Sequence, residues 1–296
     1  MKIVILGASG QLGKEFENYL RGKEEIYALT HAQLDILDFK KLSESLNKIK
    51  PDCVINCSAY TKVDMAEDEI EECFKVNAIG AKNVSYASYK INAKVIYFST
   101  DYIFDGNKDS PYTEFDEPNP LSFYGKSKLL GEEYTKIYNP NHLILRISWL
   151  YGINGRNFVK TIIQKGIKER ELKIVDDQVG SPTYTLDVVR QTLKLIEEDK
   201  VGIYHSSNQG EISWYKFAKK IFEILNIDNI NILPIKTEDY PAKAKRPRYS
   251  ALENYLLKLE NLNIMRDWER ALTDFLNTYG SFLINSYHEK GEIKSV

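Results

Sequence analysis

The stretch KIVILGASGQLGKEF, residues 2–16, decides the fold. Its first five residues are a short run of branched apolar side chains, typical of a buried strand, and an amphipathic helical pattern begins at Gln11. Between the two lie Gly7, Gly10 and Gly13. A glycine turn that joins a strand to a helix presents unpaired N–H groups to phosphates, so the stretch favours dinucleotide binding over a merely structural turn.

Each glycine has its own task in such a turn. Without a Cβ atom, the first permits the tight turn, the second lets the backbone approach a pyrophosphate, and the third allows close packing of helix on strand. The spacing G-x-x-G-x-x-G differs from the commoner G-x-G-x-x-G. The prediction therefore depends on the strand before the turn and the helix after it.

The strand-then-helix pattern repeats through the first half of the chain. Buried strands are predicted at 2–6, 25–29, 52–56, 93–99 and 142–148. Helices are predicted at 11–21, 39–49, 69–90 and 122–137. This alternation predicts an α/β fold with a Rossmann-type doubly wound parallel sheet.

Beyond Trp149 helices and short strands are mixed, which predicts a smaller C-terminal α+β part. Helices are expected near 156–169, 184–198, 213–226 and 266–285, and strands at 172–175 and 203–207. We expect a dinucleotide-binding domain over 1–150 and a mainly substrate-binding domain over 151–296. Elements near 180–206 are candidates to pack back on the first domain.

Composition excludes several classes of partner. The 296 residues are 43% hydrophobic and 28% charged, which is typical of a soluble globular protein. Because 40 basic residues face 42 acidic ones, we expect no broad cationic surface for nucleic acid or anionic lipid. The N-terminal apolar run is too short for a signal peptide or a membrane span, so a cytoplasmic protein is expected.

Residue types that bind metals are few and dispersed. The cysteines are Cys53, Cys57 and Cys73, which we expect to be buried reduced thiols, and the histidines are His31, His142, His205 and His288. This spacing matches no zinc site, so no metal site is predicted.

The end of the second predicted strand bears on the choice of cofactor. Folds that select NAD usually carry an acidic residue there to bind the ribose 2′-hydroxyl. This chain has Thr30 and His31, and the next acidic residue is Asp35, which could lie beside the adenine. A neutral or protonatable pair tolerates a 2′-phosphate better, so NADPH is expected, with NADH as the alternative.

The segment YGKSK places Tyr124 and Lys128 on one helical face. A nearby ammonium would stabilise the phenolate and lower the pKa of the phenol, which suits acid–base chemistry. Ser99 and Thr100 end the fourth predicted strand, at the edge where parallel sheets bind ligands. In a chain with 20 tyrosines the spacing alone also fits a solvated helix face. Because the Tyr124–Lys128 pair follows this strand end and the glycine turn, catalysis is favoured, with Thr100 holding a substrate carbonyl while Tyr124 protonates it.

Taken together, the motifs resemble the dTDP-4-dehydrorhamnose reductase family of the extended short-chain dehydrogenase/reductase superfamily. The resemblance runs nearly end to end, and its most telling stretches are STDYIFDG, YGKSKLLGE and RISWLYG. It implies NAD(P)H-dependent reduction of the C4 keto group of dTDP-4-dehydro-6-deoxy-L-mannose to dTDP-L-rhamnose. A nucleotide sugar is then the partner, in cell-surface polysaccharide synthesis.

The resemblance also implies roles for residues. Tyr124 would donate the proton, Lys128 would hold the nicotinamide ribose, and Thr100 would be the carbonyl-side hydroxyl. The implied cofactor positions are Gly7, Gly10, Gln11, Leu12, Gly13, Thr30, Asp35, Ile36, Ala59, Tyr60, Thr61, Ser99, Tyr124 and Lys128. The implied substrate positions are Thr100, Asp101, Trp149 and Arg246. Trp149 also fits interdomain core and Arg246 a solvated loop, and Tyr60 departs from the family's usual histidine.

Several alternatives stay open at this point. The chain could be another 4-keto-6-deoxy sugar-nucleotide reductase or an epimerase, although Asp101 is followed by Tyr102 and not by the Glu that those relatives often carry. It could also be a catalytically retired, cofactor-binding regulatory subunit. Some family members use Mg²⁺ at a dimer contact through acidic residues that cannot be matched here. Metal requirement, monomer or homodimer, nucleotide identity and product stereochemistry are therefore open.

Overall fold

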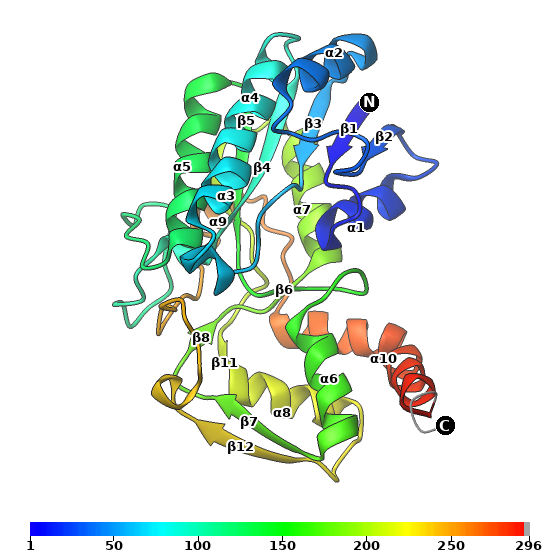
Figure 1. The fold of residues 1–296 in the computed structure, drawn as a ribbon, viewed down its shortest axis with the longest axis vertical. Coiled ribbons are helices and arrows are strands. Elements are labelled where there is room, and N and C mark those ends of the chain that lie inside the picture. The colour runs from blue at the N-terminus through cyan, green and yellow to red at the C-terminus, as the bar shows by residue number, and fades with distance from the viewer. Residues whose placement is uncertain (293–296) are drawn as a thin grey trace.

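The computed structural model describes residues 1–292, arranged as two lobes stacked along the long axis (Figure 1). The upper lobe holds a six-stranded sheet with the order β10-β5-β4-β3-β1-β2, and every neighbouring pair is parallel. The strands are β1 (Lys2–Leu6), β2 (Glu25–Leu29), β3 (Cys53–Asn56), β4 (Lys94–Thr100), β5 (His142–Ile147) and β10 (Gly202–His205). The predicted α/β fold with a doubly wound parallel sheet is confirmed.

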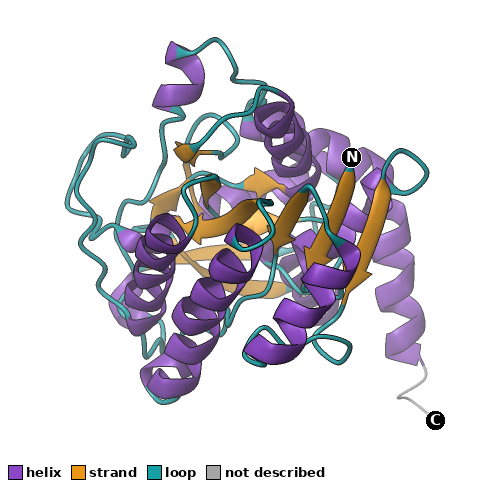
Figure 2. Cartoon of the chain, turned by 90° about the horizontal axis from the view of Figure 1, so that it is seen from above, coloured by secondary structure: helices purple, strands orange, loops and turns teal. Residues whose placement is uncertain are grey.

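Helices cover both faces of this sheet, as the view from above shows (Figure 2). The covering helices are α1 (Gln11–Leu20), α2 (Phe39–Ile49), α4 (Ala81–Tyr89), α5 (Phe123–Tyr138) and α7 (Thr185–Glu197). Ile3 and Ile5 of β1 pack in one core with residues of α1 and α7. Val4 and Leu6 pack in another core with residues of α2 and α4. Side chains alternate across a strand, so an all-apolar strand requires a helix layer on each side.

The helix predicted over 69–90 is divided. It runs as α3 (Ile70–Phe74), then a π-helical segment η2 (Lys75–Gly80), and then α4. A Cβ atom on Gly80 would lie 2.4 Å from the Cδ1 atom of Ile36, so glycine is needed where the segment meets that side chain. π-helical segments often occur at functional sites.

Two elements from the second half of the chain complete the upper lobe. Strand β10 pairs with β5, with Ile203 opposite Ile144. On α7, Val188 and Val189 are fully buried in the same core as Ile3. The chain therefore returns to the sheet after building part of the lower lobe.

The lower lobe combines helices with short sheets. Its larger elements are α6 (Phe158–Glu169), β7 (Glu171–Val175), α8 (Trp214–Ile224), β12 (Asn231–Ile235) and α10 (Trp268–Glu292). Strands β7 and β12 pair in parallel. The remaining short elements of the chain are β6 (Leu150–Tyr151), β8 (Val179–Gly180), β9 (Thr183–Tyr184), β11 (Ile212–Ser213), α9 (Tyr255–Leu259) and the 3-10 turns η1 (Met65–Glu67), η3 (Asp101–Ile103) and η4 (Thr237–Asp239); of these, α9 packs on β10, and η1 and η3 pack on α5, in the upper lobe. Within the part of the chain that the structure describes, no helix is long and apolar enough to cross a bilayer.

Candidate active site

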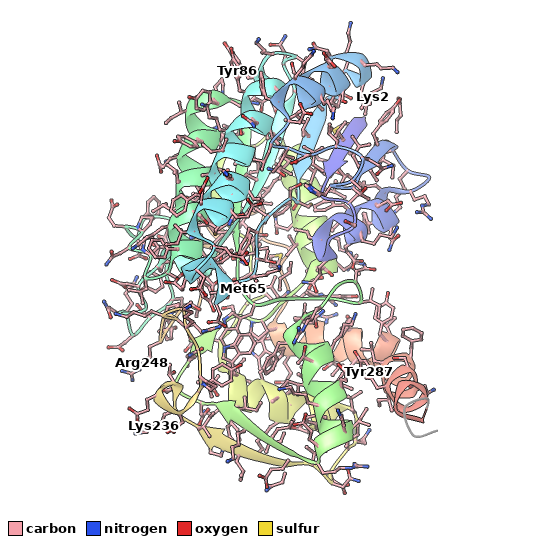
Figure 3. All side chains as sticks on the ribbon, viewed as in Figure 1. Lys2, Met65, Tyr86, Lys236, Arg248 and Tyr287 are labelled. Carbon is pink, nitrogen blue, oxygen red and sulfur yellow. The ribbon has the colours of Figure 1, made fainter. Side chains whose placement is uncertain are left out.

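The candidate site lies at the junction of the lobes, where the strands of the upper sheet end. The chain passes from β1 to β2 on one side of the sheet and from β3 to β4 and β5 on the other. Ligands of open α/β sheets bind at the point where the strand order reverses in this way. In Figure 3, Met65 lies at this junction, whereas Lys2 and Tyr86 lie at the opposite end of the upper lobe.

The glycine turn leaves β1 at this edge and is tightly packed. Gly7 has φ of +73°, and a Cβ atom there would lie 2.8 Å from the backbone nitrogen of Ser58. A Cβ atom on Gly13 would lie 2.4 Å from the carbonyl oxygen of Gly7. Gly10 caps α1 without any side-chain hydrogen bond, which leaves the first turn of the helix to bind another acceptor. This bare helix start fits a pyrophosphate.

A loop from the second half of the chain lies against this turn. The Gln11 amide donates to the carbonyl oxygen of Leu150 (3.1 Å) and accepts from the Asn157 amide (2.7 Å). Gly155 approaches Gln11 so closely that a Cβ atom on it would lie 3.1 Å from the Gln11 Cβ atom. Leu12 is buried in the core beneath the turn. Of these two predicted cofactor residues, Gln11 lies in the turn and Leu12 supports it.

The end of β2 carries no carboxylate directly. The backbone nitrogen and the hydroxyl of Thr30 both donate to the Gln33 side chain (2.9 Å each). A carboxyl oxygen of Asp35 accepts from the Leu37 backbone nitrogen (2.9 Å), so it is turned toward its own chain. Ile36 is buried beside Gly80. The residue directly at the end of β2 is therefore uncharged, as NADPH selection requires.

The segment after β3 is fixed by a residue that sequence reasoning missed. Asn77, in η2, accepts from the Tyr60 backbone nitrogen (2.8 Å) and donates to the Tyr60 carbonyl oxygen (3.0 Å). It also donates to the Ser127 hydroxyl on α5 (2.9 Å). Ala59 and Thr61, on either side of Tyr60, are exposed. The sequence offered only an asparagine in the middle of the helix predicted over 69–90, and neither its burial nor its distant partners follow from that local pattern.

Tyr124 and Thr100 are brought together as predicted. The Thr100 hydroxyl lies close enough to the Tyr124 phenol to affect its pKa. Contrary to the expected lowering, the pKa of the phenol is raised, chiefly because protein surrounds the hydroxyl; the Thr100 contact opposes that rise. A phenol in this state keeps its proton at neutral pH but is a weaker acid than free tyrosine, so its proton transfer depends on the negative charge that develops on a bound carbonyl oxygen.

Lys128 lies deeper than the helical spacing suggested. Its ammonium donates to the Phe98 carbonyl oxygen (2.5 Å) and lies 4.1 Å from the centre of the Tyr97 ring. Burial lowers the pKa of this lysine to about 7, and the nearby Glu132 carboxylate opposes the fall. The same burial that raises the pKa of Tyr124 therefore limits how much charge Lys128 can offer to it.

The residues that flank Thr100 differ in their bonding. Asp101 is buried and accepts hydrogen bonds from the hydroxyls of Thr100 (3.0 Å), Ser148 (3.1 Å) and Ser250 (2.7 Å). Ser99 is also buried, yet its hydroxyl has no hydrogen-bond partner among the described residues. A buried hydroxyl without a partner costs free energy.

A hollow of about 610 Å³ opens on the lower-lobe side of the junction. Its lining includes Tyr102, Phe158, Lys165, Trp214, Tyr240 and Arg246. The Arg246 guanidinium is held by the Asp64 carboxylate through bonds of 3.0 and 2.7 Å. Aromatic walls with a fixed cation suit a ligand that has a flat ring and an anionic group.

Trp149 lies behind this hollow and packs on its wall. Its ring stacks on Trp214 with centroids 3.3 Å apart and planes 5° apart. Trp149 has φ of +45°, and a Cβ atom on Gly180 would meet its ring at 2.4 Å. The tryptophan is therefore clamped between Trp214 and Gly180, and Trp214, which the sequence did not single out, presents an aromatic surface to the hollow.

Comparisons with known proteins show the family to which the chain is similar. The family described as RmlD substrate binding domain matches residues 1–281. A dTDP-4-dehydrorhamnose reductase from Aggregatibacter actinomycetemcomitans is 37% identical, over 92% of this chain and 97% of its own length.

Solved structures are similar over nearly the whole chain. A dTDP-4-dehydrorhamnose reductase from Clostridium acetobutylicum is 45% identical with a TM-score of 0.92, covering 95% of this chain and 100% of its own. One from Bacillus anthracis, solved in complex with NADP, is 42% identical with a TM-score of 0.92, covering 94% of this chain and 99% of its own.

Proposed function

We propose that this chain, which belongs to the RmlD substrate-binding-domain family, is an NADPH-dependent dTDP-4-dehydrorhamnose reductase. It reduces the C4 keto group of dTDP-4-dehydro-6-deoxy-L-mannose and forms dTDP-L-rhamnose. The observation that carries the proposal is the meeting of Tyr124 and Thr100 at the end of β4, on the sheet edge that also holds the glycine turn. One edge thus offers a phosphate cradle and a proton donor.

The residues around the turn fit a dinucleotide. NADPH, when bound, supplies the hydride. The pyrophosphate would rest on the turn of Gly7, Gly10 and Gly13 with Gln11, where a side chain on Gly7 or Gly13 would collide with backbone. Further contacts would come from Leu12, Thr30, Asp35, Ile36, Ala59, Tyr60, Thr61, Ser99 and Lys128.

Tyr124 supplies the proton in this proposal. Because its pKa is raised, the phenol is protonated at neutral pH and can donate to the carbonyl oxygen as negative charge develops there. Lys128 shares the helix face and, in its charged form, would stabilise the phenolate as it forms, although burial lowers the pKa of Lys128 to about 7 and so limits that charge. Thr100 orients the phenol at the carbonyl.

The sugar nucleotide would extend from Thr100 into the hollow of the lower lobe. Arg246 would meet the diphosphate, because a guanidinium fork matches paired oxygens. Trp149 and Trp214 would form an aromatic wall beside it. Both carboxyl oxygens of Asp101 already accept hydrogen bonds from protein hydroxyls. Its predicted contact with the sugar is therefore less supported than the predicted contacts of Thr100 and Arg246.

The proposal includes a cytoplasmic enzyme acting as a monomer or homodimer. All three cysteines are free thiols, and Cys53 and Cys73 are buried, which supports a reducing compartment. Among the side chains that the structure describes, no group of three or more His, Cys, Asp or Glu forms a cluster suited to a metal. A role for Mg²⁺ is suggested only by the family resemblance.

The test is NADPH oxidation with a panel of 4-keto-6-deoxy sugars carried on dTDP, UDP or GDP, with NMR of the product to fix its stereochemistry. Turnover should be fastest with dTDP-4-dehydrorhamnose. Tyr124→Phe should lower kcat by about 100-fold or more while NADPH affinity is kept. Unchanged turnover in Tyr124→Phe would remove Tyr124 from the mechanism, and no turnover with any sugar would favour a regulatory subunit.

A further inference from the structure

The Asp101 carboxylate is the centre of a buried cluster of hydroxyls that come from three parts of the chain. One oxygen accepts from Thr100 at the end of β4 (3.0 Å). The other accepts from Ser148, just after β5 (3.1 Å), and from Ser250 of the C-terminal half (2.7 Å). Only 2% of Asp101 is exposed. Its oxygens are therefore committed to the protein.

This cluster is an unusual environment for a carboxylate. Its hydrogen-bond donors are neutral hydroxyls, and burial raises the pKa of Asp101 to about 6 although all three donors favour the ionised form. The titratable groups that face it are the phenols of Tyr124 and Tyr102, and Arg246 with its partner Asp64 lies beyond Tyr102. A buried carboxylate costs free energy, so its position beside a reacting hydroxyl requires an explanation.

We propose that Asp101 is a positioning residue that fixes the direction of the Thr100 hydroxyl, with Ser250 holding Asp101 in place. A hydroxyl has one proton, and Thr100 donates it to Asp101. The lone pairs of Thr100 are then left to accept from the backbone nitrogen of Tyr102 (3.2 Å), and the hydroxyl lies beside the Tyr124 phenol. Asp101 thereby sets the direction of the Thr100 hydroxyl next to the phenol that donates the proton to the substrate carbonyl.

Ser250 connects this arrangement to the substrate side of the junction. Its backbone nitrogen donates to the Val179 carbonyl oxygen (2.8 Å), and it follows Arg246 by four residues. The segment that would hold the diphosphate is thus bonded directly to the residue that orients Thr100. The inference rests on the proposed reductase function for Thr100 and Tyr124, and deepens it.

The test compares Asp101→Asn, Ser250→Ala and Ser148→Ala with the wild type. Ser85→Ala is the matched control, because the buried Ser85 hydroxyl on α4 donates to the Thr135 hydroxyl on α5 (3.3 Å) and does not contact Asp101. Two measurements are made on each protein: the pH profile of kcat/KM between pH 5 and 8 with NADPH, and the titration of the Asp101 side-chain carbon by NMR of ¹³C-labelled enzyme loaded with NADP.

The wild type should lose activity below a pH near 6, where Asp101 becomes protonated and stops holding the Thr100 proton. Asp101→Asn should lack this acid limb and lose about tenfold or more in kcat/KM at pH 7.5, with NADPH affinity kept. Ser250→Ala should move the limb, and the NMR titration, upward by about one pH unit, since a donor to the ionised form is lost. Ser148→Ala should shift the acid limb and the NMR titration less, because the Ser148 bond to Asp101 is longer. Ser85→Ala should shift neither.

The two measurements separate the failure of this inference from the failure of the proposed function. If the sugar nucleotides are reduced but Asp101→Asn keeps the acid limb, or Ser250→Ala does not shift it, the positioning role is wrong. If no variant and no wild-type enzyme turns over any sugar, the proposed function is wrong. In that case a titration of Asp101 that responds to Ser250→Ala and not to Ser85→Ala still supports the cluster, and one that ignores Ser250→Ala overturns it.

Discussion

The carboxylate of Asp64 and the guanidinium of Arg246 face each other across the junction of the lobes, although 182 residues separate them. Asp64 also accepts from the backbone nitrogens of Lys243 and Ala244 (3.1 Å each). The Arg246 guanidinium keeps the pKa of Asp64 below its usual range. One side chain from the segment after β3 thus shapes the loop that presents the arginine.

Replacing Asp64 with Asn should therefore weaken binding on the substrate side. The guanidinium would lose its charged partner and the loop one of its acceptors, so dTDP affinity measured by calorimetry should fall by up to about tenfold. The effect is limited because the pair is partly solvated. Asp68→Asn is the control, since its ion pair with Lys243 on the same loop is exposed on both sides. Equal losses of dTDP affinity in the two variants would show that the Asp64–Arg246 contact does not specifically support substrate binding.

Cofactor selection should respond to the residue at the end of β2. Thr30→Asp places a carboxylate where a 2′-phosphate is expected, so kcat/KM for NADPH should fall by about 100-fold while that for NADH is kept or improved. Thr30→Asn is the uncharged control of nearly the same size and should retain a preference for NADPH. An unchanged preference in Thr30→Asp would place the 2′-phosphate elsewhere.

The glycine turn should be intolerant of a single methyl group. Gly7→Ala combines a positive φ with a Cβ atom 2.8 Å from the Ser58 nitrogen, so NADPH binding should be lost or the thermal midpoint should drop sharply. Gly22→Ala has a similar φ of +77° but meets nothing within 4 Å. It should cost only about 1–2 kcal/mol and leave NADPH affinity unchanged. Similar behaviour of both variants would contradict the steric argument.

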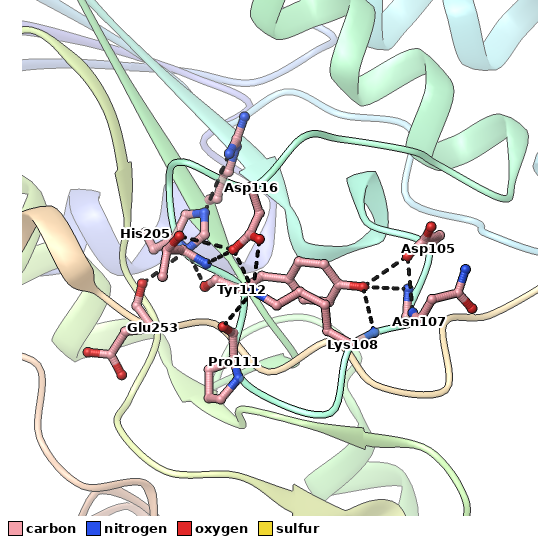
Figure 4. A network of polar contacts seen from close by, with 11 residues as sticks. Asp105, Asn107, Lys108, Pro111, Tyr112, Asp116, His205 and Glu253 are labelled. Atoms are coloured by element: carbon pink, nitrogen blue, oxygen red, sulfur yellow. Dashed lines mark hydrogen bonds and ion pairs between the residues drawn. The ribbon is translucent and has the colours of Figure 1, made fainter.

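Acid should destabilise the protein through His205. The imidazole is fully buried and contacts the carbonyl oxygens of Tyr112 (3.0 Å) and Glu253 (3.1 Å), as Figure 4 shows. Burial, assisted by the nearby Arg146, lowers the pKa of His205 to about 3. Between that value and the ordinary value of about 6.5 the unfolded chain binds a proton that the folded chain refuses. Stability should therefore fall as the pH drops from 6.5 toward 3, by about 1.4 kcal/mol per pH unit from this group.

Urea denaturation at several pH values measures this dependence. His205→Gln should flatten the slope between pH 4 and 6.5, whereas His31→Gln, which changes a highly exposed side chain, should leave it as in the wild type. A slope that survives in His205→Gln would assign the acid sensitivity to other groups.

The sequence predicted the strands well because each is a short branched apolar run between breakers. Those predicted at 2–6 and 25–29 match β1 and β2 residue for residue, those at 52–56, 142–148 and 172–175 differ by one residue at one end, 93–99 is shifted by one residue, and 203–207 begins one residue after β10 and ends two residues beyond it. The π-helical segment was missed because Lys75–Gly80 is an ordinary helical pattern. Its geometry serves contacts of Asn77 with residues 17 and 50 positions away, which no local pattern encodes.

In the site, sequence spacing predicted which residues meet but not their electrostatics. The position of Tyr124 relative to Thr100 followed from the strand end and the helix face. The direction of the pKa shift of Tyr124 did not, because burial outweighs the cation expected from Lys128. The partners of Asp101 were also missed, because isolated serines such as Ser148 and Ser250 carry no motif.

The late arrival of β10 bears on how the protein folds during synthesis. The first five strands of the sheet can leave the ribosome and begin to collapse, yet β5 keeps a bare edge until residues 202–205 emerge. An unpaired edge of this kind is open to association with other nascent chains. The growing polypeptide therefore passes through an interval, more than fifty residues long, in which chaperone capture would matter most.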